Sequence, residues 1–168
     1  MSDRGTLQRL MRNPTLMATP YWDLSSQGLV FRVVSGLWSS MLEGGLVHYY
    51  YGAHADLAAW TPNALARIGV KDCGIIMVEA NALFPEGMPP RELRSRRAAL
   101  HAIDPVGWLR LTHLADALSS QTEVLEERLL RYTQRHVGMI AVDAGILAGE
   151  MLGGSEGGLA RAPFVLAT

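Results

Sequence analysis

The sequence predicts an all-α fold, a single compact domain of about six to eight helices. Apolar residues recur every three or four positions in several segments, and capping residues or prolines stand before those segments. Sustained two-residue alternation and Asn-Gly or Asp-Gly hairpin turns are missing from the sequence, which argues against strands. A chain of 168 residues with 49% hydrophobic residues can bury one proper core.

The first long helix is expected over residues 26–43. Residues 1–25, interrupted by Pro14 and Pro20, are expected to form an irregular lead-in. From residue 26, apolar side chains fall at positions 30, 33, 34, 37, 38, 41 and 42, a stripe wide enough for a central, largely buried helix. Gly44 stands where a helix stop signal belongs.

Two further helices are predicted over residues 61–69 and 71–84. In the first, Thr61 is the expected cap, Pro62 fits the first helical position and Gly69 suits a left-handed exit. The second is apolar and closes at Pro85. The residues expected in the core are Leu37, Trp38, Leu42, Ile75, Leu83 and Phe84.

Three more helices follow, the first over residues 89–103, the second from Pro105 with Leu111, Leu114 and Leu118 on one face, and the third over residues 122–136. In the first, Glu92 and Arg96 have the i,i+4 spacing of an ion pair. Asp104 is the expected N-cap of the second. The third places Leu125 and Leu129 inward, while its charged residues, including the acids at 123, 126 and 127, are typical of a salt-bridged surface.

The domain organisation follows from these elements. An irregular lead-in over residues 1–25 precedes an all-α domain over residues 26–137. Residues 138–168 form a C-terminal extension, apolar on every side at first and then rich in glycine. The GGSEGG part of this Gly-rich tail is typical of a flexible linker, and the terminal LARAPFVLAT is expected to dock on the body or on a partner. Homo-oligomerisation through the extension stays open.

Composition excludes several function classes. A formal net charge of −1 and a pI near 6.5 argue against direct binding of nucleic acid. The early apolar run, GLVFRVVSGLW, is broken by Arg32 and falls short of the roughly 20 residues of a membrane span. Cys73, the only cysteine, lies in an apolar segment, so we expect a buried, unreactive thiol in a reducing compartment. Without a signal-peptide pattern, a cytoplasmic location is expected.

The segment EGGLVHYYYG, residues 43–52, is interpreted as a structural corner. Gly44 and Gly45 follow a helix rather than a strand, and no lysine is near, so a phosphate-binding loop is excluded. Leu46, Tyr49 and Tyr50 lie at i, i+3 and i+4, and are expected to pack together against the long helix. The side chains of His48 and Tyr51 must then point elsewhere, and His48 or a backbone carbonyl is a candidate partner for a buried tyrosine hydroxyl.

No catalytic, metal-binding or cofactor-binding residues are predicted. The spacing of His48, His54 and Asp56 matches no standard zinc pattern. The GxSxG pattern at residues 153–157 lies in the Gly-rich segment and not between a strand and a helix, so no nucleophile elbow is predicted. The one charge concentration is RELRSRR, whose arginines could receive an anionic partner through bidentate contacts. The candidates for partner binding are Glu43, His48, Tyr51, Arg91, Arg94 and Arg97.

Residues 26–137 resemble a family whose best-known member is a bacterial DNA-mimic protein and which is otherwise classed largely as a domain of unknown function. The resemblance rests on the Gly-Gly-aromatic motif, Ile-Gly, Leu-Phe-Pro and Arg-Arg in one order and spacing. The structural landmarks that match are Gly44, Gly45, Tyr49, Tyr50, Gly69, Phe84 and Pro85. Glu43, Leu46, His48 and Gly52 replace the asparagine, phenylalanine, glutamine and second asparagine of the family motif.

Three functions remain open. The favoured one is a non-enzymatic module that binds another protein, as a regulator or inhibitor. The resemblance implies the second, a DNA mimic that occupies a DNA-binding transcription factor. Such a mimic needs a dense acidic face, because duplex DNA carries one negative charge per ~1.7 Å of axis. The third is an enzyme whose site is not visible in the sequence.

Overall fold

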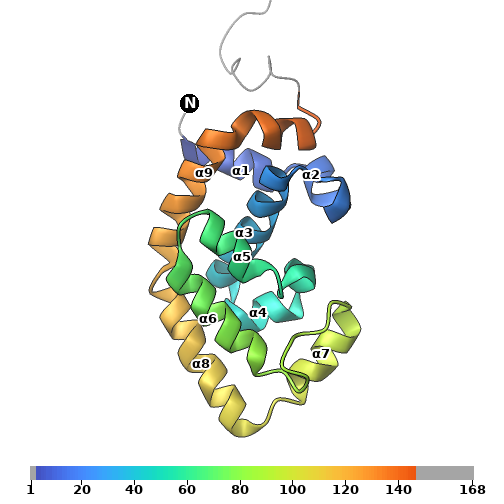
Figure 1. Ribbon diagram of the computed structural model, residues 1–168, viewed down its shortest axis with the longest axis vertical. Coiled ribbons are helices and arrows are strands. Elements are labelled where there is room, and N and C mark those ends of the chain that lie inside the picture. Colours follow the sequence, from blue (N-terminus) through green and yellow to red (C-terminus); the bar gives the residue numbers. More distant parts are fainter. Residues whose placement is uncertain (1–2, 147–168) are drawn as a thin grey trace, which may run out of the picture.

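The computed structural model describes residues 3–146, and all regular structure in this range is helical (Figure 1). The elements in chain order are α1 (Asp3–Met11), α2 (Pro14–Ala18), the 3₁₀ helix η1 (Tyr21–Asp23), α3 (Ser26–Glu43), α4 (Gly45–Tyr51), the 3₁₀ helix η2 (Ala53–Leu57), α5 (Thr61–Arg67), α6 (Lys71–Ala82), α7 (Leu93–His101), α8 (Pro105–Ser119) and α9 (Thr122–Asp143). The predicted all-α fold is confirmed, with nine α-helices in the described range rather than six to eight.

Helix α3 is the centre of the domain. It packs against α9 along much of its length and also contacts α2, α4, α5 and η2. Its apolar stripe explains this position, because Val30, Phe31 and Leu37 are all fully buried. Gly36 allows η2 to approach closely, since a Cβ atom there would lie 2.8 Å from Nδ1 of His54. Helices α8 and α9 form one long edge of the molecule, and α7 lies on the opposite side (Figure 1).

The N-terminal segment is more ordered than the sequence predicts. Residues 3–25 contain α1, α2 and η1 instead of an irregular lead-in. Asn13 caps α2 by accepting a hydrogen bond from the Leu16 N–H at 2.8 Å, and Pro14 occupies the first helical position. Leu7 and Leu10 of α1 are buried, and this helix packs against α9. The local signals are short, with Leu7, Leu10 and Met11 at helical spacing in α1 and Asn13-Pro14 at the start of α2, so these helices depend on packing against distant parts of the chain.

Helix α9 crosses the expected start of the C-terminal extension at residue 138. The helix is kinked at His136, where φ is −118° and ψ is 15°, and then continues to Asp143. The Asp143 carboxylate accepts hydrogen bonds from the backbone N–H and the hydroxyl of Ser25, the residue that caps α3. Residues 138–146 therefore belong to the folded body. The Gly-rich tail and its expected docking lie outside the described residues.

The predicted core is partly wrong. Leu37 and Phe84 are buried, and Trp38 and Leu83 pack against the core with partial exposure. Leu42, however, is 61% exposed and Ile75 is 58% exposed. Leu42 lies in the last turn of α3, just before the chain changes direction. The inner face of α6 is formed instead by Cys73, Met77 and Ala80, which places Ile75 on its outer side.

Most helix-end predictions are confirmed. Gly69 has a φ of +85° directly after α5, and the Asp104 carboxylate accepts a hydrogen bond from the Gly107 N–H at 2.8 Å. Thr61 is one exception, because its buried hydroxyl bonds to Tyr49 and to the Leu57 carbonyl instead of capping α5. The predicted start at residue 89 is also wrong, because α7 begins at Leu93. Among residues 3–146, no helix is both long and apolar enough to cross a bilayer.

Candidate functional site

The glycine pair turns the chain between α3 and α4, and its two members are required for different reasons. Gly45 has a φ of +74°, in the left-handed region that side-chain-bearing residues rarely adopt. Gly44 has a φ of −177°, which any residue can adopt, so the predicted conformational role of Gly44 is wrong. Space is limiting there instead, because a Cβ atom on Gly44 would lie 2.9 Å from Cβ of His48.

The corner packs as predicted on one side. Leu46, Tyr49 and Tyr50 are all fully buried, whereas His48 and Tyr51 are exposed. The ring of Tyr50 lies edge-on to those of Tyr49 and Phe84, with centroids 5.2 and 4.9 Å away. Edge-to-face contacts of this kind stabilise a core beyond the area they bury. The landmark aromatic residues thus form one cluster.

The tyrosine hydroxyls bond to side chains that the sequence analysis did not identify. Tyr49 shares a 2.8 Å hydrogen bond with the hydroxyl of Thr61, and Tyr50 donates to Oδ1 of Asn81 at 2.8 Å. Asn81 in turn donates from Nδ2 to the Ala58 carbonyl. Burial raises the pKa of both tyrosines, so their hydroxyls stay neutral. Neither hydroxyl uses His48. The signal in the sequence that could have identified Asn81 is its position on the apolar side of α6, beside Met77 and Ala80.

Arg96 is the central polar residue of this cluster and is completely buried (0% exposed). Its Nε donates to the Tyr50 carbonyl at 2.9 Å, one terminal nitrogen donates to the carbonyls of Pro90 and Arg91, and the other donates to the Gly52 carbonyl and to Asp56. These five bonds match the five N–H donors of a guanidinium group. Arg96 therefore ties the end of α4 and the following turn to the segment that leads into α7.

The predicted ion pair between Glu92 and Arg96 is wrong. Arg96 pairs with Asp56 at 2.8 Å, because its side chain points into the core. Glu92 is the N-cap of α7 and accepts hydrogen bonds from the backbone N–H groups of Ser95 and Arg94. Hydrogen bonding from Ser95 and then from Arg94 lowers the pKa of Glu92 to about 2. On α9, where the sequence predicts a salt-bridged surface, Glu127 pairs with Arg131.

A chain of exposed side chains covers this buried cluster, and we call it the outer face. Its members are Glu43, His48, Tyr51, Arg97 and His101. The Glu43 carboxylate lies 3.0 Å from Nε2 of His48. Tyr51 follows His48 by three positions on the same side of α4. The Arg97 guanidinium lies 4.5 Å from the Tyr51 ring centroid, and its Nε donates to the Tyr51 carbonyl. The Tyr51 hydroxyl lies 3.3 Å from Nε2 of His101.

The outer face includes four of the six predicted partner-binding residues. The other two, Arg91 and Arg94, are exposed. Arg91 precedes the first residue of α7, so the expected helical spacing of the three arginines does not hold. The positive charge of Arg91 acts on Tyr21 in η1, where it opposes the rise in pKa that burial causes. Arg97, in contrast, contacts α4. Whether any of the six binds a partner stays a prediction.

The histidines and acids near the corner contact different neighbours and do not form one cluster. Asp56 binds Arg96, His48 binds Glu43, and His54 packs beside Gly36. Burial lowers the pKa of His54. Within residues 3–146, no group of three or more His, Cys, Asp or Glu side chains is arranged to hold a metal ion. The buried side-chain nitrogen and oxygen atoms of this range all have hydrogen-bond partners.

Comparison with known proteins supports the resemblance seen in the sequence. A protein-family model described as DMP19-like protein matches residues 23–136. This match covers all of the corner, Arg96 and the outer face. No match was found among curated proteins or among solved structures. Because the family match extends over more than half of the chain, this protein belongs to the DMP19-like, DNA-mimic-like family.

Proposed function

We propose that this protein is a non-enzymatic interaction module that binds another protein through the outer face. The observation that carries the proposal is the exposed pair of Tyr51 and Arg97, fixed by a hydrogen bond and by stacking. Tyrosine and arginine dominate the binding energy of many interfaces. Because both side chains are already ordered, little conformational entropy remains to be lost on binding.

The buried cluster supports this role by holding the outer face rigid. Arg96 and Arg97 are adjacent, so the inward bonds of Arg96 fix the direction in which Arg97 leaves α7. Tyr51 lies between Tyr50, anchored in the core, and Gly52, whose carbonyl binds Arg96. An interaction surface built on rigid elements keeps its geometry better than one on loops.

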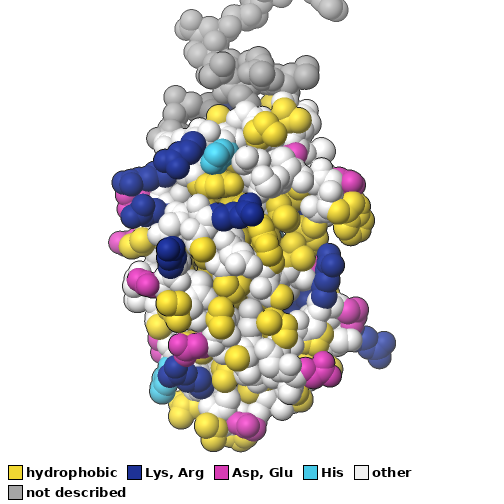
Figure 2. Space-filling view, in the orientation of Figure 1, with side chains coloured by type: hydrophobic (Ala, Val, Ile, Leu, Met, Phe, Trp, Pro, Cys, Tyr) yellow, Lys and Arg dark blue, Asp and Glu magenta, His cyan; other side chains and the backbone are white. Residues whose placement is uncertain are grey.

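A DNA mimic is the second candidate, and membership of the DMP19-like family is the observation that favours it. In that case the partner is a DNA-binding protein, and the acidic side chains imitate phosphates. Several carboxylates are instead neutralised locally, because ion pairs join Glu79 to Arg110, Glu127 to Arg131 and Asp56 to Arg96. On the face shown in Figure 2, acidic and basic side chains are interspersed. These observations favour the general interaction module.

A capture experiment tests the proposed surface. The purified protein is immobilised and exposed to extract of the source cell, in parallel with Tyr51→Ser, Arg97→Gln and the matched control Arg128→Gln on α9. We expect a protein that is retained by the parent and by the control, but lost with both outer-face variants. Equal retention by all four proteins would exclude the outer face.

A competition step separates the two candidates. A short DNA duplex is added to the captured complex at low salt. A mimic occupies the DNA site of its partner, so the duplex should release the partner, and the release should weaken as salt is raised. Retention of the partner at saturating duplex would argue against mimicry and leave the interaction module.

A further inference from the structure

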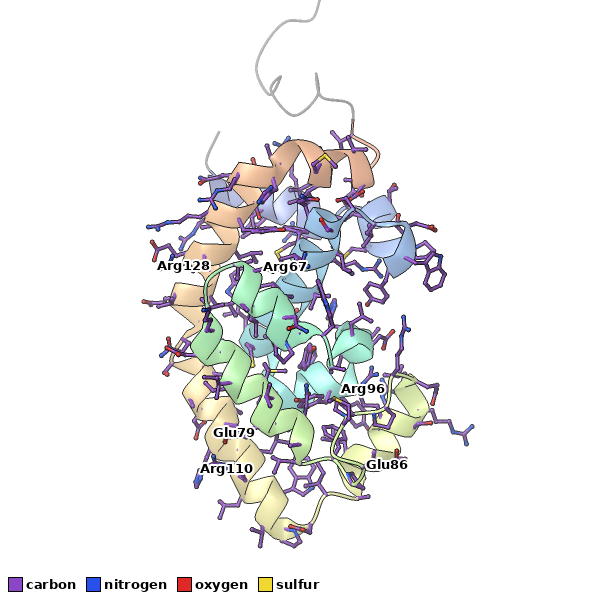
Figure 3. The ribbon with its side chains drawn as sticks, in the orientation of Figure 1. Arg67, Glu79, Glu86, Arg96, Arg110 and Arg128 are labelled. Atoms are coloured by element: carbon purple, nitrogen blue, oxygen red, sulfur yellow. The ribbon has the colours of Figure 1, made fainter. Side chains whose placement is uncertain are left out.

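Four arginines converge on a cavity between the end of α5 and α9. The cavity has a volume of about 110 Å³ and is lined by Arg67, Ile68, Arg128, Arg131, Tyr132 and Arg135. Figure 3 shows Arg128 at one edge of the molecule, Arg67 near the middle and Arg96 toward the other side, and the cavity lining shares no residue with the outer face. Its lining contains four guanidinium groups and no carboxylate.

The local fold explains the convergence. Arg128, Arg131 and Arg135 follow one another at i, i+3 and i+7, which places them on one side of α9. Arg67 comes from the last turn of α5, directly before the left-handed turn at Gly69. A Cβ atom on Gly69 would lie 3.9 Å from a terminal nitrogen of Arg128, so the α5–α6 turn and α9 meet at this guanidinium.

Internal partners offset only part of this positive charge. Arg131 is paired with Glu127, and the Arg67 guanidinium lies 5.6 Å from the ring centroid of Trp60. Another acid of this helix, Glu126, is paired with Arg4. Within residues 3–146, neither Arg128 nor Arg135 makes an ion pair. The exposed guanidinium groups therefore repel one another across a small cavity, where a ligand anion would remove the repulsion.

We infer that this arginine cleft binds the phosphoryl group of a small anionic ligand. A phosphate carries close to two negative charges at neutral pH and accepts hydrogen bonds from several directions. One carboxylate, in contrast, is satisfied by one guanidinium in a bidentate pair. A cleft with several converging arginines therefore suits a phosphate better than a carboxylate. The half-buried Tyr132 adds a hydroxyl to the same lining.

The rest of the ligand has room next to the cleft. A second cavity of about 330 Å³ shares Arg128 and extends over Lys71, Asp72, Gln121 and Val124. Asp72 and the apolar lining make this second cavity less cationic than the arginine cleft. A phosphate monoester can therefore place its phosphoryl group among the arginines and its organic part over the second cavity.

Titration calorimetry at low ionic strength tests the site. The probes are inorganic phosphate, glycerol 3-phosphate and citrate, each titrated into the parent, Arg67→Gln, Arg128→Gln and the control Arg97→Gln. All three arginines are exposed, so the variants should fold, which circular dichroism checks. Each cleft variant should weaken phosphate binding about tenfold, the effect of one charge-assisted hydrogen bond, and the control should bind like the parent.

The outcomes separate the alternatives. Tighter binding of glycerol 3-phosphate than of inorganic phosphate identifies a phosphate ester as the ligand, whereas equal or weaker binding identifies free phosphate. The inference is overturned if neither phosphate probe saturates the protein, if Arg97→Gln weakens binding as much as Arg128→Gln, or if citrate binds as tightly with the same variant dependence. The result is independent of the proposed function, because the outer-face variants test one site and the cleft variants Arg67→Gln and Arg128→Gln test the other.

Discussion

The Nε of Arg96 donates a hydrogen bond of 2.9 Å to the carbonyl oxygen of Tyr50, and both side chains are fully buried. This bond joins α7 to the last turn of α4 across 46 positions of the chain. The bond also affects the surface, because Arg97 follows Arg96 and Tyr51 follows Tyr50 in the chain. These two exposed residues are thereby brought into contact with each other. The buried pair thus positions the exposed pair.

Replacing Arg96 should destabilise the fold severely. In Arg96→Met, four carbonyl oxygens and Asp56 lose their donors, so we expect the free energy of unfolding to fall by about 3–5 kcal/mol. Equilibrium urea unfolding measures this as a lower midpoint. The matched control, Arg97→Met, removes an exposed arginine and should cost at most about 1 kcal/mol. Similar midpoints for the two variants would refute a structural role of Arg96.

Gly45 should tolerate no β-branched side chain. Its φ of +74° is strained for valine, although the space around its Cβ position is open. Gly45→Val should therefore lower the free energy of unfolding by about 1–3 kcal/mol through the backbone alone. Gly138→Ala is the control, because this glycine lies within α9 with equally open space and should gain up to about 1 kcal/mol. Thermal unfolding compares the two, and an unchanged melting temperature for Gly45→Val would contradict the strain.

The buried tyrosines should make the protein sensitive to alkali. Burial raises the pKa of Tyr49 and Tyr50 above the value of about 10 in an unfolded chain. The unfolded state then releases its protons first, so this stability is complete below about pH 10 and is lost as the pH rises further. In Tyr49→Phe, the loss above pH 10 should be shallower by up to about 1.4 kcal/mol per pH unit. Urea midpoints from pH 9 to 11 provide the test, with the exposed Tyr51→Phe as the control.

The thiol of Cys73 should be protected in the folded protein. The residue is 1% exposed, and burial raises its pKa, so both access and the thiolate fraction are reduced. A chromogenic thiol reagent at pH 8 should react much more slowly with native protein than with protein in denaturant. Equal rates would show that α6 opens readily, because the label would then report local unfolding.

The helical class, most helix ends and the residues packed at the corner can be predicted from the amino-acid sequence. These depend on neighbours within one or two turns, so periodicity and caps such as Asp104 and Gly69 reveal them. The same local signals also identified Leu46, Tyr49 and Tyr50 as one buried side of α4. The same signals are weak for α1 and α2, because both helices are short and are stabilised by packing against α9 and α3.

The partners of the buried polar groups depend on the packing of the whole domain. The sequence placed Arg96 beside Glu92 at a favourable spacing, but burial directed Arg96 toward Asp56 and four carbonyl oxygens. Asn81 became the partner of Tyr50, and Arg67 joined the arginines of α9. These contacts span many positions in the chain. A buried donor must find an acceptor wherever the fold provides one, and that choice is made by packing rather than by local spacing.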